Sequence, residues 1–144
     1  MSTVEKTPTP RPIVGVGAIV VRDGRLLVVR RGNDPFKGHW SVPGGRLEFG
    51  ETLAAGAVRE LQEETGLIGR AVGLCGLAER MSEGGHIVIC DYWVHVSGHA
   101  EPVAGDDATE VAFVTRTQLQ ARQSVPLLKE FLVAHDVWEQ MVEE

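Results

Sequence analysis

The sequence has few cysteines and no long hydrophobic run. Its two cysteines, Cys75 and Cys90, stand far apart, and neither belongs to a CxxC pair or to a Cys/His cluster with zinc-ligand spacing. The N-terminus, MSTVEKTPTPRP, lacks the apolar segment of a signal peptide, and no stretch is long enough to span a bilayer. These absences argue against a disulfide scaffold, a zinc site and a membrane anchor, and they predict free thiols in a cytoplasmic protein.

Positive charge is also scarce. The chain has 14 Lys and Arg against 20 Asp and Glu, a formal net charge of -6. Such a surface repels nucleic acid and anionic membrane, so we expect neither as a partner. A ligand that carries phosphate would need a cation to accompany it.

Several common catalytic motifs are missing. Gly15-Val16-Gly17 begins like a dinucleotide fingerprint, but Val20 replaces its third glycine. No GKS or GKT phosphate loop, HExxH, GxSxG or EF-hand loop is present. The five histidines are scattered, and we interpret them as structural or surface residues. The chemistry of this chain must therefore come from other residue types.

What is present is typical of one domain with mixed helices and strands. A chain of 144 residues can bury a single substantial core. Residues 1–12 are rich in Thr and Pro and predict a flexible tail, which leaves residues 13–144 as a single domain. Asp23-Gly24 predicts a tight hairpin between two strands rich in β-branched residues. Further strands are predicted at about 67–79, 86–98 and 110–115, and helices at about 52–65 and from about Val125 to the end. We therefore predict an α/β fold, with a mixed β-sheet sandwiched between α-helices.

The predicted helix 52–65 crowds three carboxylates, Glu60, Glu63 and Glu64, onto one arc beside its apolar face. Glu60 and Glu64 form a repulsive i,i+4 pair. Such acids resist ionising together unless a cation lies among them. Magnesium suits the set because it prefers oxygen ligands and shares its shell with substrate phosphates. The alternative is a solvated acidic face with no binding role.

The loop in front of this helix favours the metal site over the solvated face. The stretch GGRLEFGE turns at its glycines and leads Glu51 into the helix N-terminus, where the helix dipole favours a carboxylate. Arg59, two turns later, can reach back toward Glu51 as a bidentate clamp. Loop and helix would then form a rigid platform that carries the acids.

The spacing of these residues resembles the Nudix box of the Nudix hydrolases. Every specified position matches in the pattern Gly45, five residues, Glu51, seven residues, Arg59-Glu60-Leu61, one residue, Glu63-Glu64, one residue, Gly66-Leu67. The resemblance is specific to residues 45–67. It implies the Nudix fold over about residues 13–135, and it implies hydrolysis of a nucleoside diphosphate linked to another moiety. It also implies Mg2+ as the cofactor, with Mn2+ as a substitute.

The resemblance implies a role for each matching residue. Glu60, Glu63 and Glu64 match the metal-binding glutamates, and Gly45 matches the glycine whose carbonyl can join the metal shell. Glu51 and Arg59 match the structural ion pair. We place Glu51, Arg59, Glu60 and Glu63 in the catalytic set.

The general base stays open at this point. A carboxylate takes the proton of the attacking water, and in the family this role moves between the box and a later loop. The corresponding loop here is EPVAGDDATE, which offers Asp106, Asp107 and Glu110. A simple polar turn explains these loop acids equally well.

The substrate is suggested by residues around the box. HWSVPGGRLEFGE and EPVAGDD resemble small bacterial Nudix proteins described as ADP-ribose pyrophosphatase-like, so we favour an ADP-ribose-like substrate. The proline that well-defined ADP-ribose enzymes carry beyond the box is absent, which leaves a nucleoside triphosphate pyrophosphatase as the alternative. A non-catalytic nucleotide-sensing module is the third interpretation, although such modules usually lose box acids and this chain keeps all three.

Outside the box, Arg30, Arg46, Trp40 and Glu110 are candidate contacts for a small-molecule nucleotide. The arginines can pair with phosphate, and Trp40 can stack on a base, although a core position explains Trp40 better. A homodimer is a further hypothesis, because the terminal segment VPLLKEFLVAHDVW has an apolar face that a second copy could cover.

Overall fold

The computed structural model of the chain describes residues 10–83 and 85–144, so most of the predicted tail lies outside the described residues. The strands are β1 (Ile13–Ile19), β2 (Val21–Arg22), β3 (Arg25–Arg31), β4 (Trp40–Ser41), β5 (Gly44–Arg46), β6 (Arg70–Ser82), β7 (Gly85–His95) and β8 (Ala108–Val114). The helices are α1 (Leu53–Thr65), α2 (Arg116–Gln120), α3 (Leu128–Ala134) and a 3-10 turn, η1 (Trp138–Gln140). In the described part of the chain, no helix is long and apolar enough to cross a membrane.

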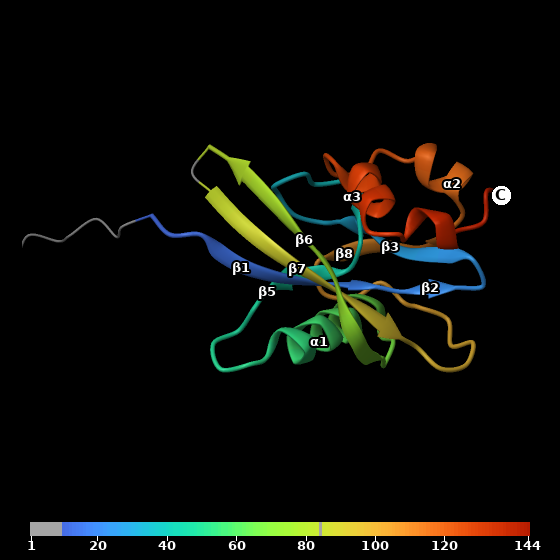
Figure 1. Cartoon of the computed structure of the whole chain (residues 1–144), viewed down its shortest axis with the longest axis horizontal. Coiled ribbons are helices and arrows are strands. Elements are labelled where there is room, and N and C mark those ends of the chain that lie inside the picture. The colour runs from blue at the N-terminus through green and yellow to red at the C-terminus, as the bar shows by residue number, and fades with distance from the viewer. Residues whose placement is uncertain (1–9, 84) are drawn as a thin grey trace, which may run out of the picture.

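The strands form two sheets. Sheet A has the order β5-β1-β7-β6, in which β1 and β7 are parallel and the other pairs antiparallel. Sheet B joins β2, β4 and β8 to β3, and all of its pairs are antiparallel. In Figure 1, α1 lies on one side of the strands and α2 and α3 lie on the other. This arrangement confirms the predicted α/β sandwich with a mixed sheet between helices.

The predicted hairpin joins β2 and β3. Asp23 and Gly24 both have positive φ, 52° and 73°, as a two-residue turn of this kind requires. The strand before the hairpin is divided between the two sheets. β1 ends at Ile19 in sheet A, and the carbonyl of Val20 accepts a hydrogen bond from the amide of Leu27 in sheet B (2.9 Å). The first segment therefore ties the two sheets together.

Helix α1 starts and ends where the sequence predicts. The Thr52 hydroxyl accepts a hydrogen bond from the amide of Ala55 (3.1 Å), and Gly66 ends the helix with a left-handed φ of 74°. Ala57 and Leu61 are fully buried in a core cluster with side chains of sheet A. This packing fixes the rotation of the helix and so directs its carboxylates.

The predicted helix from Val125 to the end is wrong. Helix α3 covers only Leu128–Ala134, Asp136 then takes a positive φ of 64°, and the chain continues in η1. Val137 and Met141 are buried in the same core cluster as α3. Because the bend turns these residues inward, the apolar face of this segment belongs to the protein's own core.

Helix α2 was not predicted, although its signal is in the sequence. Thr115 and Gln118 form a capping box: the Thr115 hydroxyl accepts from the amide of Gln118 (3.2 Å), and the Gln118 side chain accepts from the amide of Thr115 (2.9 Å). A Thr followed three residues later by Gln is a known helix-start pattern.

Candidate functional site

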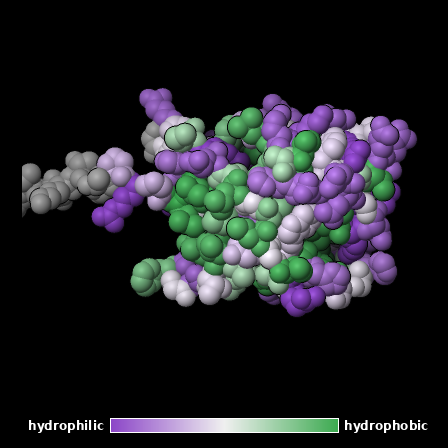
Figure 2. All heavy atoms as spheres, viewed as in Figure 1, coloured by the Kyte–Doolittle hydropathy of each residue, from purple (hydrophilic) through white to green (hydrophobic). Residues whose placement is uncertain are grey.

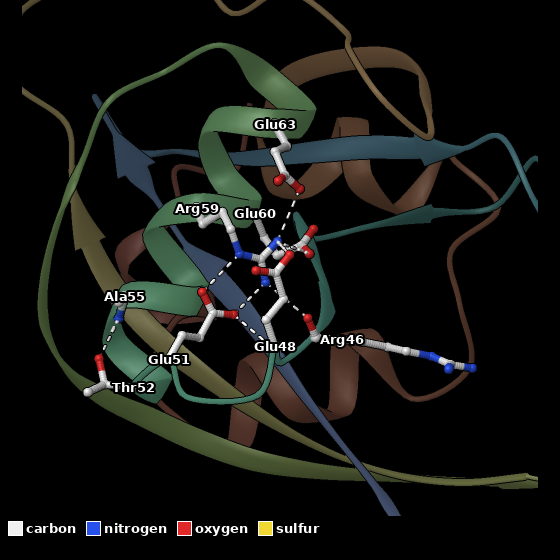
Figure 3. Close-up of polar contacts among 8 residues, drawn as sticks. All are labelled: Arg46, Glu48, Glu51, Thr52, Ala55, Arg59, Glu60 and Glu63. Carbon is white, nitrogen blue, oxygen red and sulfur yellow. Dashed lines mark hydrogen bonds and ion pairs between the residues drawn. The ribbon is translucent and has the colours of Figure 1, made fainter.

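Arg59 ties the loop before α1 to the helix. Its Nε donates to Glu51 Oε2 (2.9 Å), and its Nη2 donates to Glu51 Oε1 (2.6 Å) and to the carbonyl of Arg46 (3.0 Å), as Figure 3 shows. The hydrogen bonds from Arg59 and from the Glu48 amide lower the pKa of Glu51 to about 2. Glu51 therefore stays ionised, and the structure makes the two-point contact that the sequence predicts.

The three glutamates of α1 lie at different depths. Glu60 and Glu64 are buried, whereas the Glu63 side chain is 41% exposed. Arg59 Nη1 donates to both Glu60 Oε1 (2.8 Å) and Glu63 Oε2 (3.1 Å). Glu64 Oε2 accepts a hydrogen bond from the amide of Gly44 (3.3 Å). The carboxylates thus gather between Arg59 and the backbone of β5.

Gly45 is a glycine because a carboxylate occupies the space beside it. A Cβ atom at this position would lie 2.6 Å from Glu60 Oε1, closer than side-chain atoms approach one another. Any larger residue would push Glu60 away from β5. The loop glycine and the helix carboxylate are therefore one structural unit.

The surroundings of the buried acids Glu60 and Glu64 oppose their ionisation. Burial, followed by the neighbouring charge of Glu60, raises the pKa of Glu64 to about 8. Burial also raises the pKa of Glu60, although its bond with Arg59 opposes the shift. Buried carboxylates that resist ionisation until a cation arrives are a suitable donor set for a hard divalent ion.

The carboxylates of Glu60, Glu63 and Glu64 do not point toward one common metal position. Within residues 10–83 and 85–144, no three acidic, histidine or cysteine side chains form a group that could hold a metal ion. Glu60 and Glu63 are instead held in ion pairs by Arg59. The donor set still fits a divalent cation in its chemistry, since it offers three carboxylates and the nearby carbonyl of Gly45.

The loop after β7 brings one further acid toward the carboxylate cluster, which consists of Glu60, Glu63 and Glu64. The amides of Val103 and Gly105 donate to the carbonyls of Thr65 (2.8 Å) and Glu64 (3.0 Å), which docks the loop on the end of α1. Asp106 is close enough for its charge to raise the pKa values of Glu60 and Glu64.

The other two loop acids have partners outside the cluster. Asp107 accepts a hydrogen bond from Asn33 Nδ2 (2.7 Å), and Glu110 pairs with Arg30 (2.8 Å). Asp106 is therefore the loop acid that the structure associates with the box.

The four substrate candidates outside the box do not gather around the carboxylates. Arg30 and Glu110 bind each other at the surface, and Arg30 Nε also donates to the carbonyl of Gly38 (3.0 Å). The Arg46 side chain points away from the acids in Figure 3. Trp40 is half-buried against the core, with the guanidinium of Arg122 at 4.8 Å from its ring centre.

Two acidic residues near this region escaped the sequence reasoning. Glu48 Oε1 lies 3.7 Å from Arg59 Nη1, and the Glu48 amide donates a hydrogen bond to Glu51 Oε1 (2.9 Å). Asp91 is a buried carboxyl in β7. Its sequence signal is a single charged residue in the apolar run HIVICDYWV.

The fold and the box agree with a comparison against protein families. A family model described as the NUDIX domain matches residues 11–134, which contain every residue of the carboxylate cluster. The chain belongs to the Nudix hydrolase family.

Relatives of this Nudix chain have several names. An ADP-ribose pyrophosphatase of Methanocaldococcus jannaschii is 40% identical over 104 residues, which cover 71% of this chain and 61% of that protein. The chain thus matches less than two thirds of that relative's length. A putative 8-oxo-dGTP diphosphatase 2 of Mycobacterium tuberculosis is 36% identical over 121 residues, covering 79% of this chain and 80% of that one. The crystal structure of a MutT NUDIX hydrolase from Burkholderia pseudomallei superposes with a TM-score of 0.77 at 28% identity, covering 85% of this chain and 97% of that one.

Proposed function

We propose that this Nudix protein hydrolyses the diphosphate linkage of a nucleoside diphosphate joined to another moiety, with ADP-ribose as the favoured substrate. The main support is the pair of buried carboxylates, Glu60 and Glu64, which pack against β5. The ion pair between Arg59 and Glu51 fixes their helix to the loop before it. The 40% identical relative named ADP-ribose pyrophosphatase supports the choice of substrate. A nucleoside monophosphate would be one product.

We infer that Mg2+ is the cofactor, with Mn2+ as a substitute. Glu60, Glu63, Glu64 and the carbonyl of Gly45 would hold it. When bound, such a cation neutralises diphosphate oxygens and lowers the pKa of a coordinated water. The side chains of the protein hold the acids in place: Arg59 fixes the loop, and the Gly44 amide orients Glu64.

A carboxylate must also accept a proton from the attacking water. Glu63 is the most exposed of the three α1 glutamates, and Asp106 is the loop acid whose charge reaches them. We propose that the base is one of these two residues. The variants Glu63→Gln and Asp106→Asn separate them, because the base variant loses activity more steeply at low pH than at high pH, where hydroxide substitutes for the base.

A substrate panel tests the proposal. ADP-ribose, other nucleoside diphosphate sugars, dinucleotides, and normal and oxidised nucleoside triphosphates are incubated with Mg2+ or Mn2+, and phosphate-containing products are measured. We expect the highest kcat/KM with ADP-ribose or a close analogue, and no turnover in the presence of a chelator.

The second candidate function is a nucleoside triphosphate pyrophosphatase. The relative named putative 8-oxo-dGTP diphosphatase 2 supports it at 36% identity. A clear preference for triphosphates in the panel would establish this candidate over the first. No turnover of any compound with either metal would favour the non-catalytic nucleotide-sensing module.

We also propose a homodimer and a reducing compartment such as the cytoplasm. Four apolar side chains on the α1 side of sheet A, Val14, Leu74, Leu77 and Met81, are 41 to 72% exposed, and we call them the apolar strip. Figure 2 shows hydrophobic residues gathered over the part of the molecule that carries β1, β6 and β7. Burial of such a strip by a second copy would remove it from water. Both cysteines carry free thiols, in keeping with a reducing compartment.

A further inference from the structure

A row of glycines crosses sheet A around one buried carboxyl group. The strand register places Gly44 opposite Gly17, Gly17 opposite Asp91, and Asp91 opposite Gly76. Paired residues on neighbouring strands point to the same face of a sheet. Asp91 therefore supplies the only side chain in a row that runs across all four strands.

This row faces away from the Nudix helix. Gly45, the next residue along β5, faces Glu60 of α1, so Gly44 faces the opposite side. At the other end of the row, a Cβ atom on Gly76 would lie 2.5 Å from the His135 ring, at the end of α3. The row is thus covered at the β6 end and reaches the edge strand β5 at the other.

The Asp91 carboxyl leans toward β5. A Cβ atom on Gly17 would collide with Asp91 Oδ1 and would lie 3.2 Å from the carbonyl of Pro43. The carboxyl group thus lies over β1, about one strand spacing, roughly 5 Å, from Gly44. Gly44 is the residue whose amide binds Glu64. Asp91 therefore lies close to β5, on the face of the sheet opposite α1.

One oxygen of this carboxyl group lacks a partner among the described residues. Asp91 is 4% exposed, and its Oδ1 has no hydrogen bond. Burial raises the pKa of Asp91 to about 7, while the charge of Arg80 opposes this shift. A buried acceptor without a donor costs free energy, and proteins retain few of them.

Cationic and aromatic groups border the same region. The Arg80 guanidinium lies 5.3 Å from the ring centre of Phe36. Burial, followed by the charge of Arg31, lowers the pKa of Arg80, and the charge of Arg31 partly opposes the upward shift of the Glu64 pKa. Because the charge of Arg31 acts on both Arg80 and Glu64, the region of Arg80 and Asp91 lies close to the carboxylate cluster.

We propose that Asp91 is a specificity-determining residue that accepts a hydrogen bond from the nucleoside part of the substrate, through a base amino group or a ribose hydroxyl. The inference rests on the proposed function, because it takes a nucleotide as the substrate. A carboxyl group repels the diphosphate, so it suits the end of the substrate that has N–H and O–H donors and no phosphate. A nucleotide whose diphosphate lies at Glu60 and Glu64 can extend past β5 along the side-chain-free row toward Asp91.

The test compares substrates that differ in the hydrogen-bond donors of the base or of the ribose. These are ADP-ribose, its analogue with hypoxanthine in place of adenine, and its analogue with 2′,3′-dideoxyadenosine. The variants are Asp91→Leu, which nearly keeps the shape and removes both acceptor oxygens, and the control Glu79→Gln, which removes one negative charge from the opposite face of the same sheet. kcat/KM is measured for each combination of protein and substrate in the presence of Mg2+. The Kd values of adenosine, inosine and 2′,3′-dideoxyadenosine are measured without metal by NMR titration.

We expect the wild-type protein to prefer ADP-ribose over one analogue by about tenfold to a hundredfold, the range of a hydrogen bond to a charged group. The disfavoured analogue shows whether the donor is on the base or on the ribose. In Asp91→Leu the preference should fall to within about twofold, and in Glu79→Gln it should remain.

A folded Asp91→Leu protein with an unchanged preference, or with equal losses on all three substrates, would overturn the inference. If this variant fails to fold, equal Kd values of the three nucleosides for the wild-type protein would overturn it instead. Failure of the proposed function gives a different result: the wild-type protein turns over none of the three substrates, while its Kd values still separate the nucleosides.

Discussion

Burial acts on two separate carboxyl groups of this protein, Glu64 on α1 and Asp91 on β7. It raises the pKa of Glu64 to about 8 and that of Asp91 to about 7, so Glu64 keeps its proton at neutral pH in the absence of metal, whereas Asp91 gains or loses its proton close to neutral pH. Glu51 shows the opposite effect, because Arg59 lowers its pKa to about 2. Glu51 is thus an ionised acid that holds the loop, whereas Glu64 and Asp91 are acids whose burial opposes ionisation.

The Asp91 pKa predicts a pH-dependent stability. In the unfolded chain this group loses its proton near its ordinary pKa of 3.8, whereas the folded protein keeps the proton to about pH 7. The folded state therefore loses stability relative to the unfolded state as pH rises between these values. Asp91→Asn should flatten this slope and raise the free energy of unfolding at pH 7 by about 1 kcal/mol or more.

Metal-free denaturant titrations at pH 4, 5.5 and 7 measure this effect. Glu60 and Glu64 add slopes of the same sign, but these are present in both proteins and cancel in the difference. A difference between wild type and variant that stays constant across the pH range would contradict the assignment.

At the scale of elements, α1 is the best-predicted part of the molecule because its signals are local. The Thr52 cap, the Gly66 stop and the apolar stripe with Leu61 all lie within fifteen residues of one another. The bend after α3 could not be predicted in this way, since it depends on the packing of Val137 and Met141 against distant strands.

The same distinction separates the predicted from the unpredicted parts of the site. The contact between Arg59 and Glu51 follows from helix spacing within the box. The partnership of Arg30 with Glu110 and the glycine row around Asp91 depend on strand register across the sheets, which no local pattern specifies. The sequence therefore gives no geometric reason to place Arg30 and Glu110 near the substrate.

Gly66→Ala tests the helix stop. Alanine strains the left-handed backbone at φ 74°, and we expect a loss of about 1 kcal/mol in the free energy of unfolding. Gly73→Ala is the matched control, because a Cβ atom at either glycine would meet open space but Gly73 lacks a positive φ. Equal losses for the two variants in denaturant titrations would show that the cap conformation is not the cause.

Leu61→Ala tests the packing beneath the carboxylates. Leu61 is fully buried between α1 and sheet A, so the cavity should cost about 2 to 5 kcal/mol. The denaturant midpoint measures this loss. A loss below about 1 kcal/mol would mean that the helix is held by its loop contacts more than by its core face.

At the scale of the whole molecule, the position of the apolar strip predicts self-association. Light scattering at micromolar concentration should return a dimer mass for the wild-type protein. Leu77→Glu should return a monomer mass, because Leu77 is 56% exposed and a charge there opposes burial. Val133→Glu on α3 is the control, since Val133 is similarly exposed (54%) but lies outside the strip. A monomer mass for the wild-type protein would remove the homodimer.

The carboxylates of α1 carry the proposed catalysis, and Glu63→Gln tests this role most directly. The Glu63 side chain is half-exposed, so the amide should leave folding intact and change metal-free stability by less than about 0.5 kcal/mol. At saturating Mg2+, with the best substrate of the panel, we predict a turnover rate lower by about a hundredfold or more. Full activity in a folded Glu63→Gln protein, and likewise in Glu60→Gln and Glu64→Gln, would contradict this role and leave the three glutamates as an acidic helix face without a part in catalysis.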